Sequence, residues 1–74
     1  MSKTNQAYAK LNEQQKTYIK TISALIKRAT ENGLVEENER CRGKLRGYLE
    51  CLFQMEIISK TDLQALYLYF ITTK

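Results

Sequence analysis

The sequence predicts an all-α fold, in which a long antiparallel helical hairpin is followed by a shorter C-terminal third helix. Three observations lead to this expectation. Apolar residues recur at alternating spacings of three and four through two long segments, which is the period of a helix with one buried face. The chain has no proline and only three glycines, so its composition favours uninterrupted helices. Hydrophobic residues make up 43% of the 74 residues, which is typical of an ordered chain.

The first predicted helix covers residues 4–31. Its apolar stripe consists of Tyr8, Leu11, Gln15, Tyr18, Ile22, Leu25 and Ala29. The start of this helix is open, because Ser2 or Thr4 can cap a long helix, whereas Asn12 with Gln15 three residues later can cap a shorter one. The longer helix, beginning near Thr4, is favoured.

The second predicted helix covers residues 35–56 and runs antiparallel to the first. Gly33 ends the first helix, since glycine adopts the left-handed conformation without steric cost. The second stripe consists of Leu34, Asn38, Cys41, Leu45, Tyr48, Leu52 and Met55. A connection of a few residues favours an αα-hairpin within a single domain, 1–74.

The third predicted helix covers residues 60–72. Ser59 at the cap and Asp62 three residues later resemble a capping box placed before an apolar run. The run is apolar on most sides of the helix, which is usual for a helix that is buried on more than one side. We therefore expect it to cross both long helices or to be covered by another subunit.

The stretch CRGKLRGYLEC, residues 41–51, contains two glycines inside a helix. Each interior glycine costs about 0.8–1 kcal/mol relative to alanine, so a compensating contact is expected. Gly43, Gly47 and Cys51 are four residues apart and form a furrow of small side chains on one side of the helix. The third helix, or its copy in a partner subunit, is the predicted occupant; simple tolerance in an exposed helix is the alternative.

The sequence predicts neither a disulfide nor a metal or cofactor site. Cys41 and Cys51 are separated by about 15 Å along a helix, which exceeds the Cα limit of about 7 Å for a disulfide. The chain has no histidine and no C-x-x-C spacing, so a zinc site is not expected. No acid pair or activated nucleophile is evident either, and we therefore expect no enzymatic activity.

The positive charge is concentrated in the first part of the chain. The formal net charge is +4, and the first 30 residues hold six of the twelve cations but one acid. This asymmetry suggests a polyanion as an alternative partner, although it is not favoured over protein. The candidate contacts are Lys20, Lys27, Arg42 and Arg46.

The apolar third helix and the glycine furrow together predict a homodimer, because a small chain with a thin core often oligomerises. The predicted interface residues are Gly43, Gly47, Cys51, Leu63, Leu66, Tyr67, Leu68, Phe70 and Ile71. The favoured function is therefore a non-enzymatic protein-protein interaction module, with an unidentified protein partner. Nucleic-acid binding through the basic N-terminal helix is the alternative.

Residues 41–70, with the motifs RGKLRGYLE and ISKTDLQALY, resemble a segment of small α-helical proteins carried by conjugative elements and phages of Gram-positive bacteria. The resemblance implies an accessory role in a mobile element and carries no site or activity. No membrane span or signal peptide is expected, because no long apolar stretch is present and residues 1–10 lack an apolar core. These features and the two cysteines favour a cytoplasmic location.

Overall fold

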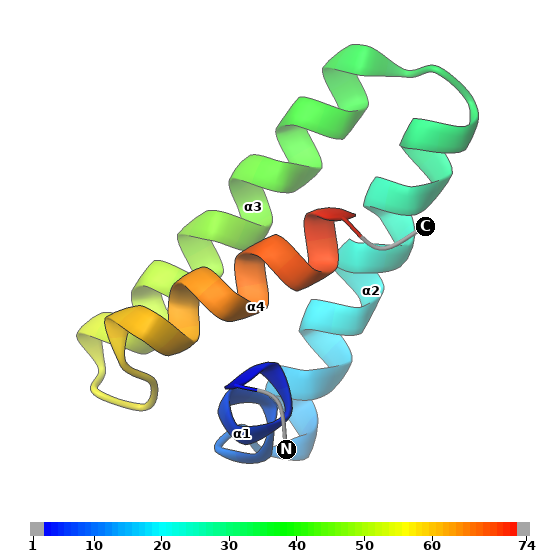
Figure 1. Ribbon diagram of the computed structural model, residues 1–74. Coiled ribbons are helices and arrows are strands. Elements are labelled where there is room, and N and C mark those ends of the chain that lie inside the picture. Colours follow the sequence, from blue (N-terminus) through cyan, green and yellow to red (C-terminus); the bar gives the residue numbers. More distant parts are fainter. Residues whose placement is uncertain (1–2, 73–74) are drawn as a thin grey trace.

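A computed structural model describes residues 3–72 of the chain. Within this range the fold consists of four α-helices without strands, so the all-α prediction is confirmed. The helices are α1 (Lys3–Ala9), α2 (Glu13–Glu31), α3 (Val35–Gln54) and α4 (Lys60–Thr72). The two long helices α2 and α3 run side by side in opposite directions, α4 crosses this pair, and α1 packs against α4 (Figure 1).

The first predicted helix, 4–31, is wrong as a single element, because the chain leaves the helical conformation between α1 and α2. The shorter start that the sequence left open is the one observed. Asn12 accepts a hydrogen bond on Oδ1 from the Gln15 backbone N–H at 2.8 Å, and its own N–H donates to Gln15 Oε1 at 2.9 Å. This reciprocal capping box satisfies two N–H groups that would otherwise lack partners at the start of α2.

The apolar stripe continues across this break because the residues before it are buried against a different neighbour. Ala7 and Leu11 are 0% and 5% exposed, and Ala7 belongs to α1, which packs against α4. In α2 the buried residues Ile19, Ile22 and Ile26 belong to the helix that packs mainly on α3. The break therefore lets one continuous stripe serve two packing surfaces.

We expect Asn12→Ala to lower the free energy of unfolding by about 1 kcal/mol, because it removes the cap of α2. Urea denaturation monitored by circular dichroism measures the change. Gln14→Ala, an exposed substitution in the first turn of the same helix, serves as the control and should leave stability nearly unchanged. Equal denaturation midpoints for the two variants would contradict the assigned cap.

The turn between α2 and α3 ends the first long helix as the sequence predicts. Gly33 has φ +67°, the left-handed conformation that glycine tolerates. The Leu34 N–H donates to the Ala29 carbonyl at 2.9 Å, and the Gly33 N–H donates to the Thr30 carbonyl at 3.3 Å. This is the Schellman arrangement, which satisfies the last carbonyl groups of α2 and reverses the chain.

The second long helix ends at Gln54, shortly before the predicted limit of 56. The Ile57 N–H donates to the Leu52 carbonyl at 3.0 Å, which again gives a Schellman arrangement. Glu56 takes the left-handed position with φ 62°, although a side chain in this conformation costs about 1 kcal/mol. The turn that follows directs α4 back along α3.

The start of α4 confirms the predicted capping box. The Asp62 N–H donates to Ser59 Oγ at 3.1 Å, and the Ser59 N–H donates to Asp62 Oδ2 at 2.9 Å. The same carboxylate oxygen lies 2.5 Å from Lys10 Nζ, at the end of α1. Asp62 therefore caps α4 and also ties the turn after α1 to it.

One core joins all four helices. α4 contacts α1, α3 and α2, so of the two arrangements expected for it, crossing the long helices is the one observed in this chain. Fully enclosed side chains such as Leu45, Leu49 and Leu66 come from α3 and α4. The complete cluster is Ala7, Leu11, Ile19, Ile22, Ile26, Cys41, Leu45, Leu49, Leu52, Ile58 and Leu66.

Candidate functional site

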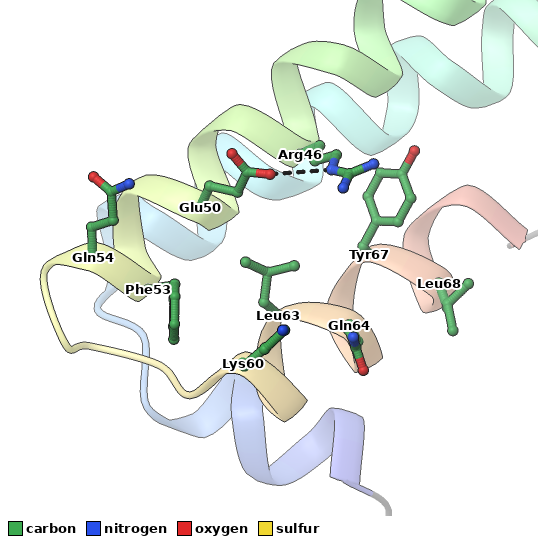
Figure 2. Close-up of a pocket in the computed structure, with 9 residues that line it drawn as sticks. All are labelled: Arg46, Glu50, Phe53, Gln54, Lys60, Leu63, Gln64, Tyr67 and Leu68. Carbon is green, nitrogen blue, oxygen red and sulfur yellow. Dashed lines mark hydrogen bonds and ion pairs between the residues drawn. The ribbon is translucent and has the colours of Figure 1, made fainter.

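A groove of about 510 Å³ lies between α3 and α4 (Figure 2). It is lined by the C-terminal part of α3 and by most of α4. The lining residues are Arg46, Glu50, Phe53, Gln54, Lys60, Leu63, Gln64, Tyr67 and Leu68. α4 separates this groove from α1, which lies on the other flank of α4 (Figure 2).

The apolar side chains of the groove come from both helices. Leu63 and Tyr67 are one turn apart on α4 and pack partly against the core. Phe53 on α3 and Leu68 on α4 remain 40% and 57% exposed. The groove therefore presents two large apolar side chains to solvent beside two that are already half-buried, and a partner that covered them would gain hydrophobic stabilisation.

The rim of the groove carries both signs of charge. Arg46 Nε donates to Glu50 Oε1 at 3.2 Å, and the pair lies along the α3 wall (Figure 2). Because both side chains are more than half exposed, this four-apart pair contributes about 0.3–0.5 kcal/mol to the helix. Lys60 adds a second cation at the start of α4. Both charge signs are thus available to a partner at the edge of an apolar centre.

The predicted interface residues of α4 lie in three environments. Leu66 is fully buried in the chain's own core, which removes it from any surface that a partner can contact. Four residues are half-buried against the core: Leu63, Tyr67, Phe70 and Ile71. Leu68 is exposed and lies in the groove.

The predicted furrow on α3 is not filled by α4. Gly43, Gly47 and Cys51 are exposed, and a Cβ atom added at either glycine would meet no heavy atom within 4 Å. The expectation that the third helix of the same chain fits against the glycines is therefore wrong. The reason is that α4 packs on the flank of α3 that carries Phe53, while neither glycine lines the groove.

The four predicted polyanion contacts do not line one cavity. Lys20 lines a cavity beside α1, Arg42 lines one at the turn between α2 and α3, and Arg46 lines the groove. Lys27 is exposed on α2. Of these four cations, Arg46 forms an ion pair within the chain, with the carboxylate of Glu50.

Two residues, Asp62 and Tyr48, have a shifted pKa, and contacts within the fold cause both shifts. The Lys10 ammonium, followed by the Ser59 N–H, lowers the pKa of Asp62, which therefore stays ionised in its cap. Burial raises the pKa of Tyr48, and the neighbouring Tyr18 raises it further; the two rings pack with centroids 4.4 Å apart. Neither group faces the groove.

The two cysteines are free, Cys41 buried and Cys51 exposed. Among the residues that the structure describes, no three Cys, Asp or Glu side chains gather in a way that could hold a metal ion. None of the helices within residues 3–72 combines the length and apolar content needed to span a bilayer.

Sequence reasoning missed the α3 side of the groove, namely Phe53 with its polar neighbours Glu50 and Gln54. Phe53 carried a usable signal, because it is a large apolar residue next to the predicted buried stripe and not on it. A residue of this kind on an otherwise amphipathic helix is expected to contact something other than the hairpin partner.

Comparisons with protein-family models, curated proteins and solved structures give no match.

Proposed function

We propose that this chain is a non-enzymatic protein-protein interaction module that forms a homodimer through the groove between α3 and α4. The observation that carries the proposal is the exposure of Phe53 and Leu68 around an apolar groove. Exposure of these side chains to water is unfavourable, and burial against a second apolar surface would stabilise the complex.

The second copy is the occupant that the charges favour. A two-fold dimer brings the same patch of both copies together, so the patch must be complementary to itself. The groove meets this condition, because its apolar centre is bordered by two cations, Arg46 and Lys60, and by one acid, Glu50. Rotation of one copy onto the other can therefore pair an acid with a base while the apolar centres meet.

The size of the chain also supports association. A domain of about 60 residues buries a smaller share of its surface than one of about 150 residues, and small scaffolds commonly compensate by oligomerising. The resemblance of residues 41–70 supports an accessory role in a mobile element. The two free cysteines support a reducing, cytoplasmic setting.

Leu68→Asp is expected to weaken the dimer by roughly thirtyfold. Covering the exposed half of a leucine contributes about 1 kcal/mol, and each substitution counts twice in a two-fold interface. Sedimentation equilibrium or light scattering across a concentration series measures the change.

Val35→Asp is the matched control, because Val35 is 69% exposed on the same chain but lies outside the groove. It should leave association unchanged. A wild-type chain that is monomeric at every concentration up to about 1 mM, which corresponds to a binding free energy of about −4 kcal/mol, would contradict the proposal. Equal losses in the two variants would contradict the assignment to the groove.

A further inference from the structure

A second cavity, of about 220 Å³, lies where α1, α2 and α4 meet, on the opposite flank of α4 from the groove. Its lining residues are Thr4, Asn5, Tyr8, Lys20, Tyr69 and Phe70. Aromatic rings, polar groups and an ammonium are present, whereas the lining contains no carboxylate. This composition suits an anion that carries a flat ring.

Two cations converge on one ring of this cavity. Lys16 Nζ lies 5.4 Å and Lys20 Nζ 5.9 Å from the centroid of Tyr8. The two lysines are four residues apart on α2, so their like charges repel each other. Glu13 Oε1 forms an ion pair with Lys16 Nζ at 3.8 Å, a distance beyond direct hydrogen bonding, so it offsets a part of this repulsion. An anion bound between the ammonium groups would relieve this repulsion.

The aromatic side chains form a continuous group. The centroids of Tyr8 and Phe70 lie 6.3 Å apart, and Phe70 meets Tyr69 edge to face at 5.0 Å. Tyr69 lines the cavity and is 52% exposed. The Tyr8 hydroxyl is buried and makes no hydrogen bond to any other described residue.

We infer that this cavity binds one nucleotide of a single-stranded nucleic acid, with the base stacked on Tyr69 and the phosphate held by Lys16 and Lys20. Single strands are bound where cations contact the backbone and aromatic rings stack on the bases, and the cavity places both kinds of group together. The inference is independent of the dimer, because none of these residues lines the groove.

The salt dependence of binding tests the two lysines. Fluorescence anisotropy of a labelled octathymidylate with the full chain should show log affinity falling against log salt with a slope of about −0.7, since one phosphate is held and each phosphate contact in a single strand contributes about −0.7. Lys20→Ala should make the slope shallower and weaken binding roughly tenfold at low salt, because Lys16 alone then holds the phosphate. Lys27→Ala, which removes the same charge from an exposed site of α2, should change the affinity far less.

Stacking is tested separately. Tyr69→Leu should weaken binding roughly tenfold, because it removes the aromatic face, whereas Tyr69→Phe should retain it. Tyr18→Leu changes an exposed tyrosine that packs against Tyr48 outside this cavity, and it should have no effect on binding. Thermal unfolding of each variant confirms that the fold is kept.

Absence of binding at about 50 mM salt would overturn the inference. Equal effects of Lys20→Ala and Lys27→Ala would also overturn it, because they would show that binding depends on diffuse charge attraction. Full affinity in Tyr69→Leu would overturn it as well. If thymidine monophosphate competed as well as the octamer, the stacking and phosphate contacts would be supported. The ligand of the cavity would then be a free nucleotide.

Discussion

Replacing Asp62 with alanine is expected to lower the free energy of unfolding by about 3 kcal/mol. One carboxylate, 8% exposed, accepts a hydrogen bond from the Ser59 N–H and an ion pair from Lys10. The hydrogen bond from the Ser59 N–H to this charged group contributes about 1.5–3 kcal/mol, and alanine at 62 keeps the other capping bond, from the residue 62 N–H to Ser59 Oγ. The ion pair adds about 1 kcal/mol at most, since the Lys10 side chain is half exposed. Urea denaturation at pH 7 measures the total.

The same carboxylate predicts a dependence of stability on pH. Its folded pKa is lowered from 3.8, mainly by Lys10 and then by the Ser59 N–H. The folded state therefore binds fewer protons than the unfolded state, and stability rises with pH across this range. The contribution is complete well above pH 3.8 and is lost as the pH falls through the folded pKa. Asp62→Ala should lose less stability than the wild type between pH 5 and about pH 2.

Two matched variants separate the roles of Asp62. Lys10→Gln removes the ion pair and keeps the cap, whereas Ser59→Ala removes the hydroxyl and keeps the ion pair. Each should cost about 1 kcal/mol. If Asp62→Ala destabilised the chain no more than Ser59→Ala, the proposed link between α1 and α4 would have no energetic role.

The helix ends that depend on local chemistry were predictable from the sequence. Gly33 and the Ser59–Asp62 capping box each act through hydrogen bonds between residues that are close in the sequence. A short stretch of sequence is therefore enough to predict each of them. The Asn12 cap has the same local signal. It was not favoured because the stripe from Tyr8 to Ala29 continues through it with a helical period.

The site could not be predicted in the same way, because it depends on which flank of α3 receives α4. The sequence pattern favours the glycine furrow, where close approach is sterically easy. The turn after Gln54, with Glu56 in the left-handed conformation, instead directs α4 to the flank that carries Phe53. The direction of a helix after a turn follows from three-dimensional packing, and periodicity alone does not encode it.

Gly43→Ala combined with Gly47→Ala is expected to raise the free energy of unfolding by about 2 kcal/mol. Alanine favours the helix by about 0.8–1 kcal/mol at each position, and the added methyl groups meet no neighbour within 4 Å. For a chain of this size the gain corresponds to an increase in melting temperature of about 8–16 °C. Thermal unfolding at low protein concentration measures it. Gly33→Ala is the opposite control, because its positive φ makes alanine destabilising.

The double alanine variant also distinguishes the two surfaces of α3. Neither glycine lines the groove, so a dimer that forms through Phe53 and Leu68 should keep its affinity in this variant and lose it in Leu68→Asp. A dimer that forms through the glycine furrow should respond in the reverse way, because added methyl groups keep a second helix from approaching closely. A stability gain well below 1 kcal/mol would show that the glycines do not occupy an open helix surface.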